Sequence, residues 1–356
     1  MIREIGSIFS LDYTFYKESD LSVSPMETDG RYNYSLCREA LYDIASAYDA
    51  TSKRVMIPAY TCGTVITPFT EQGWKCLYYP VDRRLRIPVK NVLVLAENFR
   101  PDIFIVHPYC GMDLDADELE FIEVMRKRGC RIVVDITQCI FSSQYDTVAD
   151  YVVGSYRKWL PMPDGAFLYF AHGDRLEVHN YSENKEFVNF QKEAMYLRHC
   201  YFRTGDVELK KISIHLNKWV SGSVEKSTYP HKMSDLSYTV YLDADMEKNQ
   251  ASRIKNYRFL YEHLSGNMIV SPVCDIKDVT TAPLYFPLYS SNREYLQRKL
   301  AEDGIYAPVL WPLHDKALLI NDDIEHIYSR ILMLPIDQRY GLDDMSFIVN
   351  KIENNV

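Results

Sequence analysis

The sequence lacks the long apolar runs that a membrane-spanning helix requires. No apolar stretch approaches the length of about 18 residues that favours such a helix. The first 20 residues, MIREIGSIFSLDYTFYKESD, carry acidic side chains and no clean apolar core, which is not typical of a signal peptide. These two absences lead us to expect a cytoplasmic protein.

Two kinds of binding motif are also missing. The eight cysteines form no CxxC pair and no Cys/His spacing of a metal site, and several lie among apolar residues, as reduced buried thiols do. We therefore expect no disulfide framework and no bound metal. Runs of Lys and Arg are absent, and the net charge is −9 from 49 acidic and 40 basic residues. Nucleic acid is therefore not an expected partner.

The composition that is present is that of an ordinary globular protein, with 47% hydrophobic and 25% charged residues. A length of 356 residues suggests about two domains. In the first two-thirds, short apolar runs alternate with segments whose apolar residues recur at helical spacing. The expected strands are 54–57, 75–79, 102–106, 131–135, 151–155 and 166–170, and the expected helices are 36–48, 63–72 and 115–128. This alternation predicts an α/β fold with a mostly parallel central sheet covered by helices.

The last third of the chain has a different pattern. Residues 187–219 show no clean period and are expected to hold a helix and a loop, whereas 233–264 predicts one long helix that links two domains. Beyond it, a β-α-β-α set is expected at 283–287, 292–303, 306–310 and 342–352. We therefore divide the chain into an N-terminal arm (1–25), a large domain (26–240), and a linking helix with a small α+β domain (241–356).

A carboxylate and an amine that follow two expected strands are the most informative residues. Asp135 ends the apolar run in RIVVDITQ, and Lys158 lies in the loop GSYRKWLPMPDGAF after the next run. Ligands of parallel sheets bind beyond the carboxyl ends of the strands. A lysine amine can hold the aldehyde of pyridoxal phosphate (PLP) as a Schiff base, and an aspartate can pair with its protonated pyridine nitrogen. The same two residues are also compatible with a strand-end cap and a solvated loop lysine.

Six segments, in order, resemble those of one enzyme family. They are VMIPAYTCGTVI, IVHPYCGMDLDADEL, VVDITQ, KMSDLSYTVYLDADMEKNQASRIKNYRFLYEHL, GIYAPVLWPLHD and ILMLPID. On these segments the chain, from about residue 33 to residue 352, resembles the DegT/DnrJ/EryC1/StrS group of sugar aminotransferases. The resemblance implies the fold type I, aspartate aminotransferase-like fold of PLP-dependent transferases, with PLP as the cofactor.

The resemblance also implies roles for single residues. It makes Lys158 the Schiff-base lysine and the group that moves a proton between substrate and cofactor, for which the amine must be neutral. It pairs Asp135 with the pyridine nitrogen and brings Gln138 to the phenolic oxygen or the ring of the cofactor. Ser155 resembles a phosphate-binding serine, although a plain strand-end serine suits the same position.

The segment SLCREAL, residues 35–41, resembles the family's helix start at the cofactor phosphate. Backbone amides and a helix dipole suit a phosphate. The resemblance therefore places the amides of Cys37 and Arg38 on that group. Cys37 stands where the family usually has glycine, so the backbone there needs a conformation open to other residues.

Several positions depart from the family's pattern. Arg157 precedes the lysine where the family has threonine, and Ser155 lies three residues before the lysine instead of five. Cys62 stands where the family stacks an aromatic ring on the cofactor, and a thiol contacts a ring without stacking. The partner-subunit segment Asn-Tyr-Arg-Met appears as PHKM, which makes Lys232 the candidate charge for the phosphate of the partner. His314, in WPLHD, is a candidate substrate contact.

The resemblance implies an aminotransferase that takes an amino group from an amino acid, by family habit glutamate. The acceptor would be a nucleotide-linked keto sugar in surface polysaccharide or deoxyamino-sugar synthesis, and the enzyme a homodimer with shared active sites. Two alternatives stay open: a PLP-dependent sugar dehydratase or amino-acid transaminase on the same scaffold, and a PLP-fold protein that binds without turnover. The retained Lys158 argues against the known dehydratase pattern, in which a histidine takes that position. His107, before a proline at a strand end, is expected to be a structural imidazole.

Overall fold

The computed structural model of the chain describes residues 3–47, 52–224 and 229–354. An eight-stranded sheet forms its centre, with the strand order β1-β2-β8-β7-β6-β5-β3-β4. The strands are β1 (Glu27–Thr28), β2 (Arg31–Tyr34), β3 (Arg54–Pro58), β4 (Lys75–Tyr79), β5 (Ile103–Val106), β6 (Arg131–Asp135), β7 (Tyr151–Gly154) and β8 (Ala166–Phe170). The strands from β4 to β7 run parallel, whereas β8, β2 and β1 pair antiparallel at the other edge. The mostly parallel central sheet expected from the sequence is confirmed.

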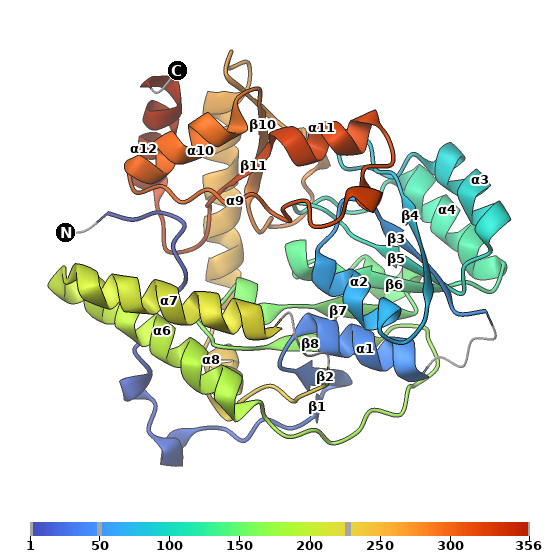
Figure 1. Cartoon of the computed structure of the whole chain (residues 1–356), viewed down its shortest axis with the longest axis horizontal. Helices are drawn as coiled ribbons and strands as arrows, with labels where there is room; N and C mark the ends of the chain where they lie inside the picture. Colours follow the sequence, from blue (N-terminus) through green and yellow to red (C-terminus); the bar gives the residue numbers. More distant parts are fainter. Residues whose placement is uncertain (1–2, 48–51, 225–228, 355–356) are drawn as a thin grey trace.

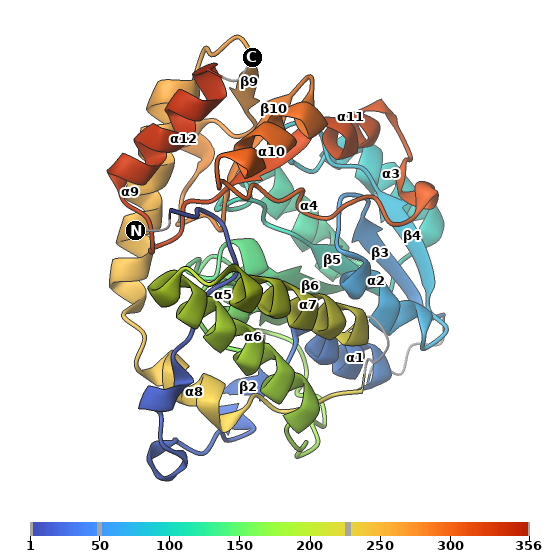
Figure 2. The ribbon, with the colours of Figure 1, turned by 60° about the vertical axis from the view of Figure 1, so that its left-hand side comes forward.

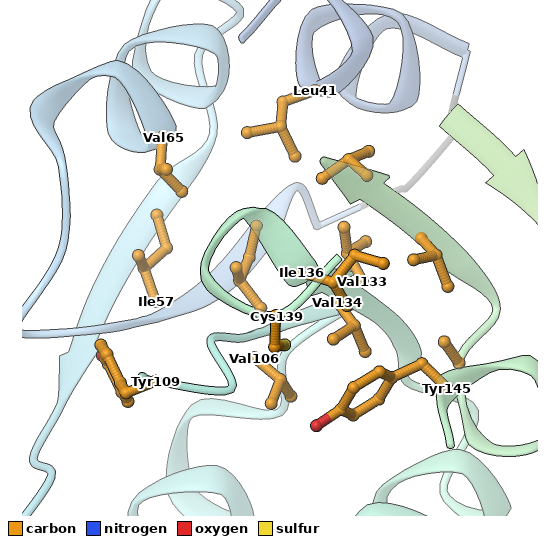
Figure 3. Close-up of a cluster of buried hydrophobic side chains, with 14 of the residues drawn as sticks. Leu41, Ile57, Val65, Val106, Tyr109, Val133, Val134, Ile136, Cys139 and Tyr145 are labelled. Carbon is orange, nitrogen blue, oxygen red and sulfur yellow. The ribbon is translucent and has the colours of Figure 1, made fainter. Parts of the chain in front are cut away.

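All six expected strands are present, and their ends differ from the prediction by at most one residue. β5, β6 and β7 are rich in Ile and Val and are almost wholly buried, because side chains cover both faces of the sheet. Figure 3 shows this core: Val133 and Val134 of β6 lie with Leu41 and Val65 on one side and Tyr145 on the other. Apolar runs without alternation were therefore a sound signal for buried strands.

The helices of the large domain up to β8 are α1 (Cys37–Ala47), α2 (Gly63–Thr70), α3 (Val89–Phe99), α4 (Ala116–Lys127) and α5 (Tyr145–Val148). The three predicted helices correspond to α1, α2 and α4, although Tyr48, the last residue of the first prediction, lies outside the described residues. α4 begins at a capping box. The Asp115 carboxylate accepts a hydrogen bond from the Glu118 amide (2.9 Å), and the Glu118 carboxylate accepts one from the Asp115 amide (3.0 Å).

Two long helices follow the central sheet and form a hairpin. α6 (Lys185–Thr204) and α7 (Val207–Val224) lie side by side (Figures 1 and 2). The prediction of one helix and a loop at 187–219 is therefore wrong. α6 ends at Gly205, whose φ of +78° lets the chain reverse. The second helix escaped the sequence pattern because few of its side chains are buried, Ser213 and Val220 among them.

Two helices also replace the single long helix predicted at 233–264. α8 (Asp235–Leu242) ends shortly before Asp245. The carboxylate of Asp245 accepts a hydrogen bond from the Lys248 amide (2.9 Å) and so caps the start of α9 (Met246–Leu264). Apolar residues recur at helical spacing across the break between α8 and α9, so periodicity did not reveal the break.

The small domain has its own three-stranded antiparallel sheet, in the order β11-β10-β9, and its own core. Its elements after α9 are β9 (Val270–Pro272), β10 (Phe286–Ser290), α10 (Arg293–Glu302), α11 (Asp322–Arg330), β11 (Ile331–Leu334) and α12 (Leu342–Asn354). The helices predicted at 292–303 and 342–352 are confirmed, and the strand predicted at 283–287 lies three residues later, as β10. No helix among the described residues is long and apolar enough to cross a membrane.

The N-terminal arm runs to the small domain. Ile5 packs in the small-domain core and pairs with Ile305 as an isolated bridge. The strand predicted at 306–310 is wrong, because the chain pairs only briefly with the arm there. The division at residues 25 and 240 stays a prediction; residues 1–2 and 355–356 of its outer segments lie outside the described residues.

Gly111 joins the two domains through a backbone conformation that favours glycine. Its φ is +77°, and its carbonyl accepts hydrogen bonds from the amides of Thr280 and Thr281 (3.0 and 3.1 Å). A Cβ atom at Gly111 would lie 2.5 Å from the carbonyl oxygen of Thr281. Gly129 is a matched control, because its φ is +85° and a Cβ atom there would meet nothing within 4 Å.

We expect Gly129→Ala to lower the free energy of unfolding by about 1 kcal/mol, the cost of a left-handed alanine. Gly111→Ala carries the same cost and adds a steric clash, so its loss should be about 2 kcal/mol larger. Urea denaturation of both variants measures the difference. Equal losses would show that the contact between Gly111 and Thr281 does not constrain the fold.

Candidate functional site

A cavity lies at the carboxyl ends of the parallel strands, where the sequence predicts the site. Asp135 ends β6, Ser155 follows β7, and Cys62 follows the end of β3 and precedes α2. Six of the predicted residues line this cavity: Cys37, Arg38, Cys62, Asp135, Ser155 and Lys158. Residues from four separate segments of the chain thus meet at one place, as the rule for parallel sheets predicts.

Asp135 is held in a fixed orientation at the base of the cavity. Its carboxylate accepts a hydrogen bond from the Thr137 amide (2.9 Å), and its second oxygen lies 3.8 Å from Nδ1 of His107. The other ring nitrogen of His107 lies 2.7 Å from the hydroxyl oxygen of Thr61. Burial lowers the pKa of His107, so the imidazole is neutral at pH 7 and does not form an ion pair with Asp135. The carboxylate can therefore accept a hydrogen bond from a protonated ring nitrogen on the cavity side.

Lys158 lies in a short turn that packing holds in place. The turn, Tyr156–Lys158, follows β7, and the next residue, Trp159, is buried. The indole nitrogen of Trp159 donates a hydrogen bond to the carbonyl of Thr137 (2.8 Å), which ties the lysine turn to the turn after Asp135. The Lys158 amine has no hydrogen-bond or ion-pair partner among the residues that the structure describes. It is therefore available to a ligand in the cavity.

An anion would be stabilised at the other end of the cavity. α1 begins at Cys37, and the amides of its first turn have a partial positive charge. Arg38 is 3% exposed, yet its Nε and Nη2 atoms have no hydrogen-bond partner in the described part of the chain. A buried guanidinium whose donors have no hydrogen-bond partner is costly, so Nε and Nη2 of Arg38 indicate a place for an anion.

Arg157 adds a second positive charge at the same place. Its side chain is half-buried, lines the cavity, and has no ion-pair partner among the described residues. Burial lowers the pKa of both Arg38 and Arg157, and the charge of Arg157 lowers that of Arg38 further. Two guanidinium groups without an ion-pair partner among the described residues, beside a helix start, suit a dianion such as a phosphate monoester. The residues present therefore fit PLP: a phosphate site, a carboxylate for the ring nitrogen, and a free amine.

Two thiols also line the cavity. Cys62 lies with its sulfur 3.0 Å from the Thr64 hydroxyl, and Cys37 is the first residue of α1. Burial, with the negative charge of Asp135, raises the pKa of the Cys37 thiol well above its ordinary value. The thiol is therefore neutral at physiological pH and does not cancel the positive charge of the arginines.

Trp311 is a cavity residue that sequence reasoning missed. It comes from the loop after the arm-paired segment of the small domain and is 8% exposed. Its ring centroid lies 5.2 Å from that of Tyr60 and 5.4 Å from that of His107. The φ of Trp311 is +55°, a strained conformation for a large side chain. Trp311 thus brings to the cavity an aromatic ring, which Cys62 does not offer. Trp311 lies in the segment WPLHD, but nothing in the sequence indicated where its ring points.

Gln138 is buried beside the cavity without lining it. Its side-chain oxygen accepts a hydrogen bond from the Cys110 amide (3.0 Å), and its Nε2 atom has no partner among the described residues. The predicted contact between Gln138 and the cofactor stays a prediction.

Lys232 and His314 lie outside the cavity. The Lys232 amine donates to the Ser24 carbonyl (3.1 Å) and lies 3.4 Å from a carboxylate oxygen of Asp235, so groups of its own subunit hold it. His314 is exposed, and its ring lies against the backbone of Gly63 at the start of α2. Their roles toward a partner subunit and a substrate stay predictions. No group of three or more possible metal ligands is found in the part of the chain that the structure describes.

A second cavity adjoins the first. Its volume is about 300 Å³, at the lower end of the range for ligand pockets. Arg157 and Lys158 line both cavities. The lysine amine therefore lies where a group bound in the first cavity can meet a molecule bound in the second.

Comparison with known proteins bears on the fold. No protein-family profile and no curated protein sequence matches the chain. PseC of Helicobacter pylori, an aminotransferase involved in the biosynthesis of pseudoaminic acid, is similar in structure with a TM-score of 0.69, at 11% identity and over 99% of both chains. The sugar aminotransferase CalS13 of Micromonospora echinospora has a TM-score of 0.64 at 15% identity, over 91% of this chain and 86% of its own.

NtdA of Bacillus subtilis, solved with the bound cofactor PMP, has a TM-score of 0.63 at 14% identity, over 91% of this chain and 73% of its own. The chain has the fold of these aminotransferases. At such low identity the likeness shows the fold and not the activity. The fold type I architecture of PLP-dependent transferases, expected from the six sequence segments, is therefore confirmed.

The raised pKa of Cys37 predicts an unusual pH dependence of its alkylation. Because only the thiolate reacts, and the thiolate forms above the pKa, the rate should still be rising at pH values where a cysteine in a free peptide has already reached its plateau. Mass spectrometry of iodoacetamide-treated protein between pH 7 and pH 10 follows the rate at this residue. A pH midpoint equal to that of the free peptide would contradict the raised pKa of the Cys37 thiol.

Proposed function

We propose that the protein is a PLP-dependent aminotransferase that moves an amino group from an amino acid to a nucleotide-linked keto sugar. This proposal rests on one observation: Lys158, Asp135, Arg38 and Arg157 line one cavity. The fold supports it, since the similar structures include a sugar aminotransferase and a protein with bound PMP. Glutamate, the donor that the family resemblance implies, is the first amino acid to test.

Each residue of the cavity would have its own role toward the cofactor. Arg38 and Arg157, with the first amides of α1 and the hydroxyl of Ser155, would hold the phosphate. Asp135 would accept a hydrogen bond from the pyridine nitrogen and keep it protonated. Lys158 would hold the cofactor covalently, and its released amine would move a proton at the substrate carbon. PLP, when bound, supplies an electron sink beside that carbon.

We also propose a homodimer in the cytoplasm, as the family resemblance implies. Lys232, the candidate residue for a phosphate contact across the dimer, is already held by Ser24 and Asp235 of its own subunit. Arg38 and Arg157 of the same subunit would bind the phosphate in place of the partner's lysine. On this proposal the phosphate site is complete within one subunit.

Replacement of Lys158 tests the proposed activity. Wild-type protein with PLP should show the visible absorbance of the lysine-bound cofactor, lose it when glutamate is added, and regain it with a keto-sugar nucleotide. Lys158→Ala should lack the band and lose at least about 100-fold in rate, because proton transfer is removed. Lys127→Ala, at an exposed lysine on α4, is the control. An unchanged spectrum in Lys158→Ala would refute the assignment, and a wild-type spectrum that responds to no amino donor would favour binding without turnover.

Replacement of the two arginines tests the phosphate site. Arg38→Gln and Arg157→Gln should each weaken PLP binding about 10- to 100-fold, the effect expected for one hydrogen bond to a charged group. Titration of the apoprotein with PLP, followed by absorbance, measures the dissociation constant. Arg175→Gln is the matched control, because Arg175 is exposed and lies outside both cavities at the candidate site. Wild-type affinity in both cavity variants would place the phosphate elsewhere.

A further inference from the structure

The second cavity has walls of unlike chemistry. Lys158 lies where it meets the first cavity, and Arg253, Asp337 and Arg339 line it from the small-domain side. The α6–α7 hairpin lines it with Gln191 of α6 and Asn217 of α7. None of the lining residues on the hairpin is charged, so the hairpin presents a neutral polar wall.

The charged groups of the small-domain side are engaged with the protein. Arg339 donates two hydrogen bonds to the Asp337 carboxylate (2.7 and 2.9 Å), so this pair has no net charge. Arg253 lies over the ring of Trp159, 4.4 Å from its centroid, and donates to the carbonyl of Leu284 (2.8 Å). The neutral polar groups without a partner are therefore on the hairpin and the arm, whereas Arg157 and Lys158 lie where the two cavities meet.

Three polar side chains of the cavity, two on the hairpin and one on the arm, have no partner among the described residues. Gln191 and Asn217 are half-buried, and neither side-chain amide has a hydrogen bond among the described residues. The hydroxyl of Ser7, from the N-terminal arm, also lines the cavity; it is buried and unpartnered. The buried hydroxyl of Ser7 costs free energy while it has no partner, whereas the half-exposed amides are open to a ligand. Two amides and a hydroxyl, each able to donate and accept, suit the hydroxyl groups of a sugar ring better than an apolar or a charged ligand.

A buried ion network holds the wall rigid. The carboxylate of Glu4, in the arm, pairs with Arg198 of α6 and with Lys210 of α7, whose amine lies 2.6 Å from it. Lys210 also donates to the hydroxyl of Tyr306 in the small domain (2.9 Å). The hairpin, the arm and the small domain are thus fastened at one point. Binding groups on rigid elements select ligands more sharply than groups on mobile loops.

We infer that Gln191 and Asn217 of the α6–α7 hairpin determine acceptor specificity by binding the hydroxyl groups of the keto sugar. The inference rests on the proposed function and assigns the acceptor to this wall of the second cavity. The amino donor does not need the wall, because its carboxylate and amine are charged groups. The two halves of the transamination should therefore respond differently to changes in the hairpin.

Gln191→Ala, Asn217→Ala and the double variant test the inference. The donor half-reaction is followed as the loss of visible absorbance with glutamate, and it should stay within about twofold of wild type. The acceptor half-reaction is followed as the return of absorbance with UDP- and dTDP-linked 4-keto-6-deoxyhexoses. Its KM should rise about 3- to 10-fold for each single variant, the effect of one neutral hydrogen bond, and further for the double variant. Asn189→Ala, at an exposed amide elsewhere on α6, is the control and should leave both halves unchanged.

The outcomes separate this inference from the proposed function. An unchanged acceptor KM in the double variant, with a normal donor half-reaction, would overturn the inference alone. Equal losses in both halves would do so too, because they would indicate a purely structural role for the hairpin. Turnover with 2-oxoglutarate or pyruvate but with none of the sugar nucleotides would overturn the sugar assignment of the wall. A wild-type protein that fails already in the donor half-reaction would refute the proposed function.

Discussion

The parallel pairing of β6 with β7 is the constraint on which the site depends. Asp135 pairs in register with Val153, so the aspartate and the turn that carries Lys158 leave the sheet side by side. A shift of one residue would turn Asp135 to the opposite face of the sheet. The hydrogen bond from the buried Trp159 to Thr137 then holds the two turns together. The amine and the carboxylate thus owe their proximity to sheet register and to one buried indole.

Around that centre, charge is distributed unevenly. Arg38 and Arg157 have no ion-pair partner among the described residues, whereas His107 is neutral because burial lowers its pKa. Such an arrangement costs folding free energy, and an anion bound between the arginines would recover it. On the other side of Lys158, the second cavity presents neutral amides, and its Asp337–Arg339 pair balances itself. On the proposed function, Lys158 therefore lies between the phosphate of the cofactor and the neutral polar groups that would bind the sugar.

The large-domain sheet and several helices could be predicted from the sequence because local periodicity reports burial. Continuous apolar runs marked six of the eight strands of the sheet, β1 and β2 excepted, and helical spacing marked α1, α2 and α4. The same signal failed where burial is slight or a cap interrupts an apolar pattern. α7 buries few side chains, and Asp245 separates α8 from α9 without a gap in apolar spacing.

The sequence by itself determined the strand ends, and with them the positions of Asp135 and Lys158, because neighbouring residues decide where a strand stops. Only the tertiary structure decided which distant residues share the cavities. Arg38 and Arg157 come together, and Trp311 reaches the site from the small domain, through packing between segments far apart in the chain. Gln191 and Asn217 meet the second cavity for the same reason. Periodicity and motif spacing report local burial, and they do not report which side chains are left without partners once the chain has folded.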